Sequence, residues 1–153
     1  MCYSAEIEAD YKKYVRVIGA ERALSMEDFV SKYWERTKSS TLKIPKALDG
    51  WFSGDPEIGQ AIAQWKDDQT TKLEQDLFKQ KKRLADAERT LQTKTTKKAQ
   101  EDKRISSEKI EWSLGKLASL KGPELVPDDL RIFPGWYAPV IVSENGRRVV
   151  NPE

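Results

Sequence analysis

The first third of the chain shows apolar residues at the spacing of short amphipathic helices. They recur every three or four positions from Ile7 to Ile18 and again from Phe29 to Trp34, which is the period of a helix with one buried face. Ser25 and Asp28 resemble a capping box ahead of the second set, and Pro45 suits the start of a third helix. We predict short packed helices here, with their aromatic side chains in the core.

The middle of the chain has the composition of a long helix. Neither glycine nor proline occurs between Gln60 and Leu114, and the stretch is rich in Lys, Glu, Gln and Ala. A single helix of this length would reach about 80 Å. Its weakest point is the Thr-Lys-Thr-Thr run at 93–96, because β-branched residues lower helix propensity. We therefore predict a long antiparallel helical hairpin over residues 56–121, bent at that run.

The first helix of this hairpin carries a coiled-coil-like stripe. Its apolar positions share one seven-residue register with Gln80 as a polar interruption, and they are Leu73, Leu77, Leu84, Ala87 and Leu91. We expect the second helix to face them with Ile105, Ile110, Leu114 and Leu117. The competing interpretation is a straight helix that pairs through residues 73–91 with a second copy or with a partner helix.

After Leu120 the pattern changes to that of strands and turns. Residues 131–139 form a loop-like passage rich in aromatic residues and proline. Two β-prone runs follow, Val140–Val142 and Arg148–Val150, and between them stands Asn145-Gly146, a strong hairpin signal. We predict a C-terminal β-hairpin and, over residues 1–153, a single mainly helical domain of the α+β class.

Composition narrows the functional classes. Hydrophobic residues make up 38% and charged residues 34% of the 153 residues, with a net charge of only +2, so much of the chain must lie in solvated surface. Basic clusters at 79–83 and 94–98 alternate with acidic residues. This pattern favours a solvated, ion-paired helix face over a phosphate site.

Several sites and compartments are disfavoured by what the sequence lacks. One cysteine cannot build a disulfide framework, and no signal segment opens the chain. No apolar run approaches the length of a membrane span, about 18 residues. The absence of histidine removes the commonest general base and metal ligand. We expect a cytoplasmic protein with no membrane partner, no metal and no cofactor.

The single cysteine stands directly behind the initiator methionine. Removal of Met1 would leave Cys2 with a free α-amine beside its thiol. The thiol titrates near 8.5 and the amine near 7.7–8.0 when unperturbed, so about neutral pH both are partly reactive. Together they can close a five-membered thiazolidine ring on an aldehyde. A lone cysteine is usually a small buried hydrophobe, but chain termini are seldom buried.

Three segments resemble the SOS-response-associated peptidase (SRAP) family. They are the opening Met1-Cys2-Tyr3-Ser4-Ala5, the helix with Tyr33-Trp34-Glu35-Arg36, and the passage from Arg131 to Pro139 that runs into Val140–Val142. The chain is similar to the bacterial and phage members with a long helical insertion, here 56–121. It resembles the N-terminal part of such a protein, and hence an incomplete SRAP fold.

The resemblance implies a DNA-damage-response function. Family members bind single-stranded DNA and capture abasic sites as a covalent thiazolidine through the N-terminal cysteine, which autocatalytic removal of Met1 exposes. Cys2 would then be the catalytic nucleophile. The implied DNA-binding residues are Tyr3, Ser4, Arg131, Trp136, Tyr137, Pro139, Arg147 and Arg148. Trp136 and Tyr137 would stack on bases, and the arginines would meet phosphates; packing in the hairpin is the alternative for the two aromatics.

The chain also departs from the family pattern. Many members read Cys-Gly-Arg at the start, where this chain has Cys2-Tyr3-Ser4. The Asn, Glu and His that complete the family's site come from segments after the hairpin, and this chain has no histidine. We expect its autopeptidase and crosslinking activity to be impaired. We favour a truncated SRAP chain over a degenerate relative, and the alternative functions are a non-catalytic DNA-binding module and a helical coiled-coil interaction module.

Overall fold

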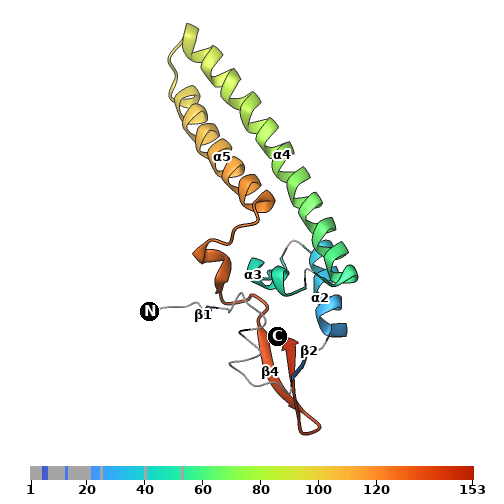
Figure 1. Cartoon of the computed structure of the whole chain (residues 1–153). Coiled ribbons are helices and arrows are strands. Elements are labelled where there is room, and N and C mark those ends of the chain that lie inside the picture. The colour runs from blue at the N-terminus through green and yellow to red at the C-terminus, as the bar shows by residue number, and fades with distance from the viewer. Residues whose placement is uncertain (1–4, 7–12, 14–21, 25, 40, 53) are drawn as a thin grey trace. The chain divides into compact units, whose positions relative to one another are not determined.

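The computed structural model describes the chain apart from residues 1–4, 7–12, 14–21, 25, 40 and 53. Two compact units are distinguished: residues 1–65 with 125–153 form unit 1, and residues 66–124 form unit 2. Helix α4, Pro56–Thr93, runs from the first into the second. The described elements confirm a mainly helical α+β fold with a long helical hairpin and a C-terminal β-hairpin (Figure 1).

Short helices make up one part of unit 1, as predicted. Helix α2, Met26–Lys38, buries Phe29 and Tyr33. Helix α3, Lys46–Asp49, begins directly after Pro45 and continues into the short 3-10 helix η1, Gly50–Phe52. The helix expected over residues 7–18 and the capping residue Ser25 lie outside the described residues.

The start of α4 is fixed by a local cap. The carboxylate of Asp55 accepts a hydrogen bond from the Ile58 N–H at 2.8 Å, and its carbonyl accepts one from the Gly59 N–H. Pro56 takes the first helical position, where its missing N–H costs nothing. The Asp-Pro pair therefore sets where the long helix begins.

The predicted β-hairpin is present and belongs to a three-stranded sheet. Strands β4, Pro139–Glu144, and β5, Arg147–Pro152, pair antiparallel across Asn145 and Gly146, whose φ angles are 52° and 77°. Strand β2, Arg22–Leu24, adds to β5 in parallel. This strand corrects the expectation of helices alone in the first third of the chain. It also supplies the neighbour that an isolated hairpin needs for stability.

A second, smaller sheet joins the two chain segments that make up unit 1. Strand β1, Ala5–Glu6, pairs antiparallel with β3, Arg131–Ile132, in the register Ala5 to Ile132 and Glu6 to Arg131. The 3-10 helix η2, Pro127–Leu130, leads into β3. Leu130 and Ile132 pack on the buried residues Ala47 and Leu48 of α3, so this small sheet is attached to the helices.

The main core of unit 1 is built by side chains from α2, η1, the start of α4 and β5. The buried cluster consists of Phe29, Tyr33, Phe52, Ile58, Ala61, Ile62 and Val150. The ring of Phe52 lies 4.9 Å from that of Phe29 and 5.6 Å from that of Tyr33, measured between centroids. The described aromatic residues of this region thus belong to the core, as predicted, with Trp34 and Trp51 partly buried against it.

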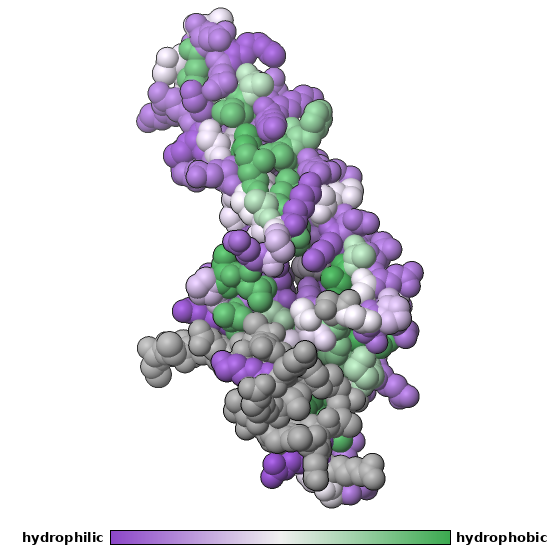
Figure 2. Space-filling view, viewed as in Figure 1, coloured by the Kyte–Doolittle hydropathy of each residue, from purple (hydrophilic) through white to green (hydrophobic). Residues whose placement is uncertain are grey.

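Unit 2 is the predicted helical hairpin. Helix α4 ends at Thr93, and α5, Lys97–Lys121, begins after a three-residue break. Thr96 caps α5, because its hydroxyl accepts a hydrogen bond from the Ala99 N–H at 3.1 Å. The break falls within the threonine-rich run, and it excludes a straight uninterrupted helix through this region. A strip of apolar side chains runs along the hairpin between polar flanks (Figure 2).

The predicted stripe on α4 faces α5. Gln80 and Ala87 are buried, and the leucines of the stripe are half-buried. On α5 the prediction is confirmed at Leu117, which is buried, and Ile105 and Ile110 are half-buried. It is wrong at Leu114, which is 49% exposed. Its neighbour Ser113 is fully buried instead, in a seven-residue series with Ala99 and Ser106. The buried face of α5 therefore carries the small residues Ala99, Ser106 and Ser113 besides Leu117, and hydrophobicity alone does not reveal the two serines.

Candidate functional site

The pairing of β1 with β3 brings two of the resemblance segments together. Ala5 follows the opening Met-Cys by three positions and lies opposite Ile132, at the start of the aromatic passage. Cys2, Tyr3 and Ser4 themselves lie outside the described residues. Of the opening segment, the structure describes Ala5 and places it at the start of β1. The candidate site is therefore the region of unit 1 around β1 and β3.

The aromatic passage after β3 folds as a tight turn. The Trp136 N–H donates to the Phe133 carbonyl at 3.0 Å, and Gly135 adopts φ 84°, a left-handed conformation that glycine tolerates best. The rings of Phe133 and Trp136 meet edge to face at 5.2 Å between centroids. Phe133 is exposed and Trp136 half-buried. Trp136 thus has one aromatic neighbour from its own turn and retains partial access to solvent.

Tyr137 is held in place by two segments far away in sequence. Its N–H donates to the Lys43 carbonyl at 2.9 Å, and its hydroxyl accepts from Lys32 Nζ at 3.0 Å. The same ammonium group lies 4.6 Å from the ring centroid, within cation–π range. The hydrogen bonds to Tyr137 and then to Glu35 raise the pKa of Lys32. The half-buried side chain of Tyr137 is therefore held in a fixed position beside the positively charged ammonium group of Lys32.

The chain around Pro139 is fixed through the end of β5. Ala138 and Glu153 exchange backbone hydrogen bonds at 2.9 and 3.0 Å. Pro139 stands opposite Pro152, where neither residue can donate to the ladder. The Tyr137-Ala138-Pro139 turn is consequently anchored on both sides.

The two predicted arginines whose side chains are described, Arg131 and Arg148, lie in different sheets. Arg131 is exposed and lies 3.9 Å from Asp128, too loose for a strong ion pair. Arg148 is exposed on β5, in the other sheet. The side chain of Arg147 lies outside the described residues. Arg131, Trp136, Tyr137 and Pro139 follow one another along the segment 131–139, whereas Arg148 lies on β5 of the three-stranded sheet.

Unit 1 holds a buried polar cluster that was not predicted from the sequence. Arg36 of α2 is only 2% exposed, and its Nη1 lies 3.3 Å from the carboxylate of Asp49. Its guanidinium carbon lies 4.8 Å from the ring centroid of Tyr33 and 4.2 Å from that of Trp65. Burial, followed by the charge of Asp49, raises the pKa of the Tyr33 hydroxyl. The available signal was Arg36 three positions after Tyr33, on the apolar face of its helix.

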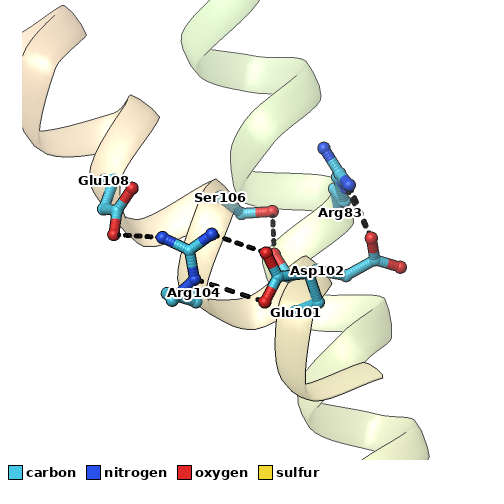
Figure 3. A network of polar contacts seen from close by, with 6 residues as sticks. All are labelled: Arg83, Glu101, Asp102, Arg104, Ser106 and Glu108. Atoms are coloured by element: carbon cyan, nitrogen blue, oxygen red, sulfur yellow. Dashed lines mark hydrogen bonds and ion pairs between the residues drawn. The ribbon is translucent and has the colours of Figure 1, made fainter. Parts of the chain in front are cut away.

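The helical hairpin carries a dense set of ion pairs (Figure 3). Arg83 of α4 pairs with Asp102 of α5, and Arg104 pairs with both Glu101 and Glu108 within α5. Asp86 pairs with Arg89, and Glu88 with Lys103. The predicted ion-paired face is therefore confirmed for the carboxylates at 79–104 and for Arg83. It is wrong for the lysines, since the following six are exposed and have no ion pair among the described residues: Lys79, Lys81, Lys82, Lys94, Lys97 and Lys98.

Two further tests concern metals and membranes. Among the described residues, no three His, Cys, Asp or Glu side chains gather closely enough to hold a metal ion. Within the same part of the chain, no helix is both long and apolar enough to cross a membrane.

In comparisons with known proteins, no family model, curated protein or solved structure matches this chain.

Proposed function

We propose that this protein captures abasic sites in single-stranded DNA through Cys2, in the manner of the SRAP proteins that its sequence resembles. Removal of Met1 by hydrolysis of the Met1–Cys2 peptide bond frees the α-amine. The exposed 1,2-aminothiol then reacts with the aldehyde of a ring-opened abasic sugar. The product is a thiazolidine that links protein and DNA.

One observation carries the proposal: the register of Ala5 opposite Ile132. It pairs Ala5, three positions after Cys2, with the start of the segment that holds Trp136 and Tyr137, although more than a hundred residues separate them in sequence. An aromatic pair beside a basic side chain is what a single strand requires, because bases stack on rings and phosphates meet cations. Here Lys32 and Arg131 supply the cations.

The reaction balances without an oxidant or a co-reactant. The amine nitrogen attacks the aldehyde carbon, and loss of one water gives an imine. The thiolate then adds to the imine carbon and the nitrogen takes up a proton, which closes the ring. Because the chain has no histidine, water or a carboxylate must carry the protons, and we expect slow crosslinking.

The test is incubation with a labelled single strand that holds one abasic site. We expect a heat-stable shift of the oligonucleotide that depends on Cys2. A strand with a tetrahydrofuran analogue, which has no aldehyde, should give none. A heat-stable crosslink of undiminished yield with Cys2→Ala would remove Cys2 from the mechanism.

A matched variant separates the two bond-forming steps. Cys2→Ser, prepared with Met1 already removed, keeps an α-amine and a hydroxyl at residue 2 but loses the thiolate, so an imine forms and the thiazolidine does not. We expect a crosslink that survives only after borohydride reduction. Equal heat stability of the Cys2→Ser and wild-type products without reduction would contradict the thiazolidine assignment.

A helical interaction module is the second candidate, and the exposed apolar side chains of the hairpin favour it. Phe78 is 73%, Trp112 58% and Leu114 49% exposed, so a partner helix could bury them. The residues of the stripe at 73–91 already pack within the hairpin, so a partner would use these outer positions. Light scattering that shows a strictly monomeric mass at high concentration would reject self-association.

A further inference from the structure

The closed end of the helical hairpin, residues 79–104, holds an unusual surplus of positive charge. It carries ten Lys and Arg against four Asp and Glu, whereas the whole chain has a net charge of +2. We call this segment the basic end. The rest of the chain carries a net negative charge that largely cancels the positive charge of the basic end. The net charge of the whole chain therefore does not reveal it.

Ion pairing sharpens this asymmetry. Each of the four carboxylates in the basic end is bound by a basic side chain of the same segment: Asp86 by Arg89, Glu88 by Lys103, Glu101 by Arg104 and Asp102 by Arg83. The six exposed lysines then remain without an ion pair among the described residues. The surplus of six positive charges is thus located on these six lysine side chains.

Three of these lysines share one groove. Lys79 and Lys82 of α4 and Lys98 of α5 line a hollow of about 500 Å³ on unit 2. Thr96 contributes a hydroxyl group to the same lining, and the two carboxylates there, Asp86 and Asp102, are each paired with an arginine. The three ammonium groups and the Thr96 hydroxyl can donate to phosphate oxygens. Because arginines neutralise the two carboxylates, the groove keeps a net positive charge that suits an anionic backbone.

Helix stability alone does not favour this placement. Lys97 and Lys98 lie in the first turn of α5, which has no acidic residue, and the last turn of α4 has no basic residue. A helix favours negative charge at its N-terminus and positive charge at its C-terminus. Both helices therefore depart from the arrangement that would stabilise them, as functional surfaces often do. The N-terminus of α5 instead adds to the attraction for phosphate.

We propose that the basic end binds the phosphate backbone of duplex DNA, as a contact separate from the Cys2 chemistry. Residues 79–104 contain no aromatic residue, and single-strand binding relies on stacking bases against aromatic rings. The backbone of a duplex needs only cations and hydrogen-bond donors. The helix from Lys79 to Thr93 rises about 21 Å, a length of duplex that carries about 12 phosphates. Six lysines fit within that number.

The same residues argue against an anionic membrane surface as the partner. Helices that lie in a membrane interface bury Trp, Phe or Leu side chains beneath their basic face. Phe78, which is 73% exposed, borders the basic end, and no other exposed large apolar residue among the described residues lies between positions 78 and 104. The basic end therefore offers six lysines with one aromatic ring at its margin, where an interfacial helix would have a whole apolar face.

The experiment measures binding of a fluorescent, undamaged duplex to the full chain over a range of salt concentrations. The test variant replaces Lys79, Lys82 and Lys98 with Gln, and the matched control replaces Lys66, Lys72 and Lys109, which lie outside the basic end on the same hairpin. Glutamine keeps helix propensity, and circular dichroism checks that both variants are folded.

We expect the test variant to lower the slope of log affinity against log salt by about 2–3 and to weaken duplex binding roughly 100-fold or more at about 0.1 M salt. The control variant should stay within a few-fold of the wild type, and Cys2→Ala should bind the duplex unchanged. The Cys2→Ala result separates this proposal from the capture of abasic sites.

Three results would overturn the proposal. One is an equal loss of affinity in both triple variants, and another is no measurable duplex binding at low salt. The third is competition by polyglutamate or anionic phospholipid vesicles that matches duplex competitor charge for charge, because the surface would then select no nucleic acid.

Discussion

The guanidinium of Arg36 lies over the indole ring of Trp65, 4.2 Å from its centroid, in the interior of unit 1. The same group contacts the ring of Tyr33 and pairs with Asp49. Its Nε and Nη2 have no hydrogen-bond partner among the described residues. A buried charge held chiefly by two aromatic faces and one carboxylate links α2, α3 and the beginning of α4.

Removal of this charge should destabilise the fold. Arg36→Ala leaves Asp49 buried without its cation, and breaking one side of a buried ion pair costs about 3–5 kcal/mol. We expect the free energy of unfolding to fall by that amount in urea titrations followed by tryptophan fluorescence. Arg89→Ala is the matched control, because Arg89 is 77% exposed and its pair with Asp86 is a surface pair, worth less than about 1 kcal/mol. Equal losses in the two variants would contradict a special role for Arg36.

A buried hydroxyl in the hairpin gives a prediction of the opposite sign. Ser113 is fully buried, and its Oγ has no partner among the described residues. Ser113→Ala removes an unsatisfied polar group and improves helix propensity, so we expect a gain of about 1–2 kcal/mol. Ser107→Ala is the control for propensity alone, because Ser107 is exposed and its hydroxyl donates to the Lys103 carbonyl at 2.8 Å. A larger rise in the thermal unfolding temperature for Ser107→Ala than for Ser113→Ala would contradict the burial of an unsatisfied hydroxyl at Ser113.

Two glycines of unit 1 should respond to alanine in opposite directions. Gly146 has φ 77° in the turn between β4 and β5, where a Cβ is unfavourable by about 1–2 kcal/mol. Gly59 lies within α4 with open space around its Cα, so alanine there should stabilise by about 0.5–1 kcal/mol. Chemical denaturation of Gly146→Ala and Gly59→Ala measures both. Destabilisation of equal size in the two variants would contradict the described turn.

The carboxylate of Glu101 should titrate below its ordinary range. Its hydrogen bond with Arg104 lowers its pKa from 4.5. A carboxylate with a lowered pKa in the folded state stabilises that state above pH 4.5, and this contribution disappears as the pH falls through the lowered pKa. We expect an NMR titration of the Glu101 side chain to have its midpoint below 4.5 and to return toward 4.5 in Arg104→Gln. An unchanged midpoint in that variant would mean that the pair does not persist in solution.

The helical hairpin, its bend and the turn between β4 and β5 were predictable from the sequence, because each depends on local composition. The long helices were predicted because neither Gly nor Pro occurs from Gln60 to Leu114. The bend was predicted from the threonine-rich run at 93–96. Asn145-Gly146 gave the turn, since both positions require positive φ. In these cases, propensity and tertiary structure favour the same conformation.

Features set by tertiary contacts were not predictable in this way. Strand β2 has three residues and forms because β5 offers an edge for parallel pairing, which no local pattern records. Ser113 is buried and Leu114 exposed, because the direction of α5 relative to α4 decides which residue faces inward. Arg36 is buried because Tyr33, Trp65 and Asp49 surround it, and these partners are distributed over three segments. For the candidate site, the sequence named the aromatic passage but not the Lys32 contact that positions Tyr137.

The most direct measurement is the mass of the protein after reaction with a single strand that carries one abasic site. Digestion with trypsin after nuclease treatment should release a peptide of residues 2–12 that begins at Cys2. We predict that this peptide carries the abasic sugar with loss of one water, and that fragmentation places the addition on Cys2. An addition on a lysine of another peptide, or an unmodified Cys2 with a free α-amine after prolonged incubation, would contradict the proposed capture of abasic sites.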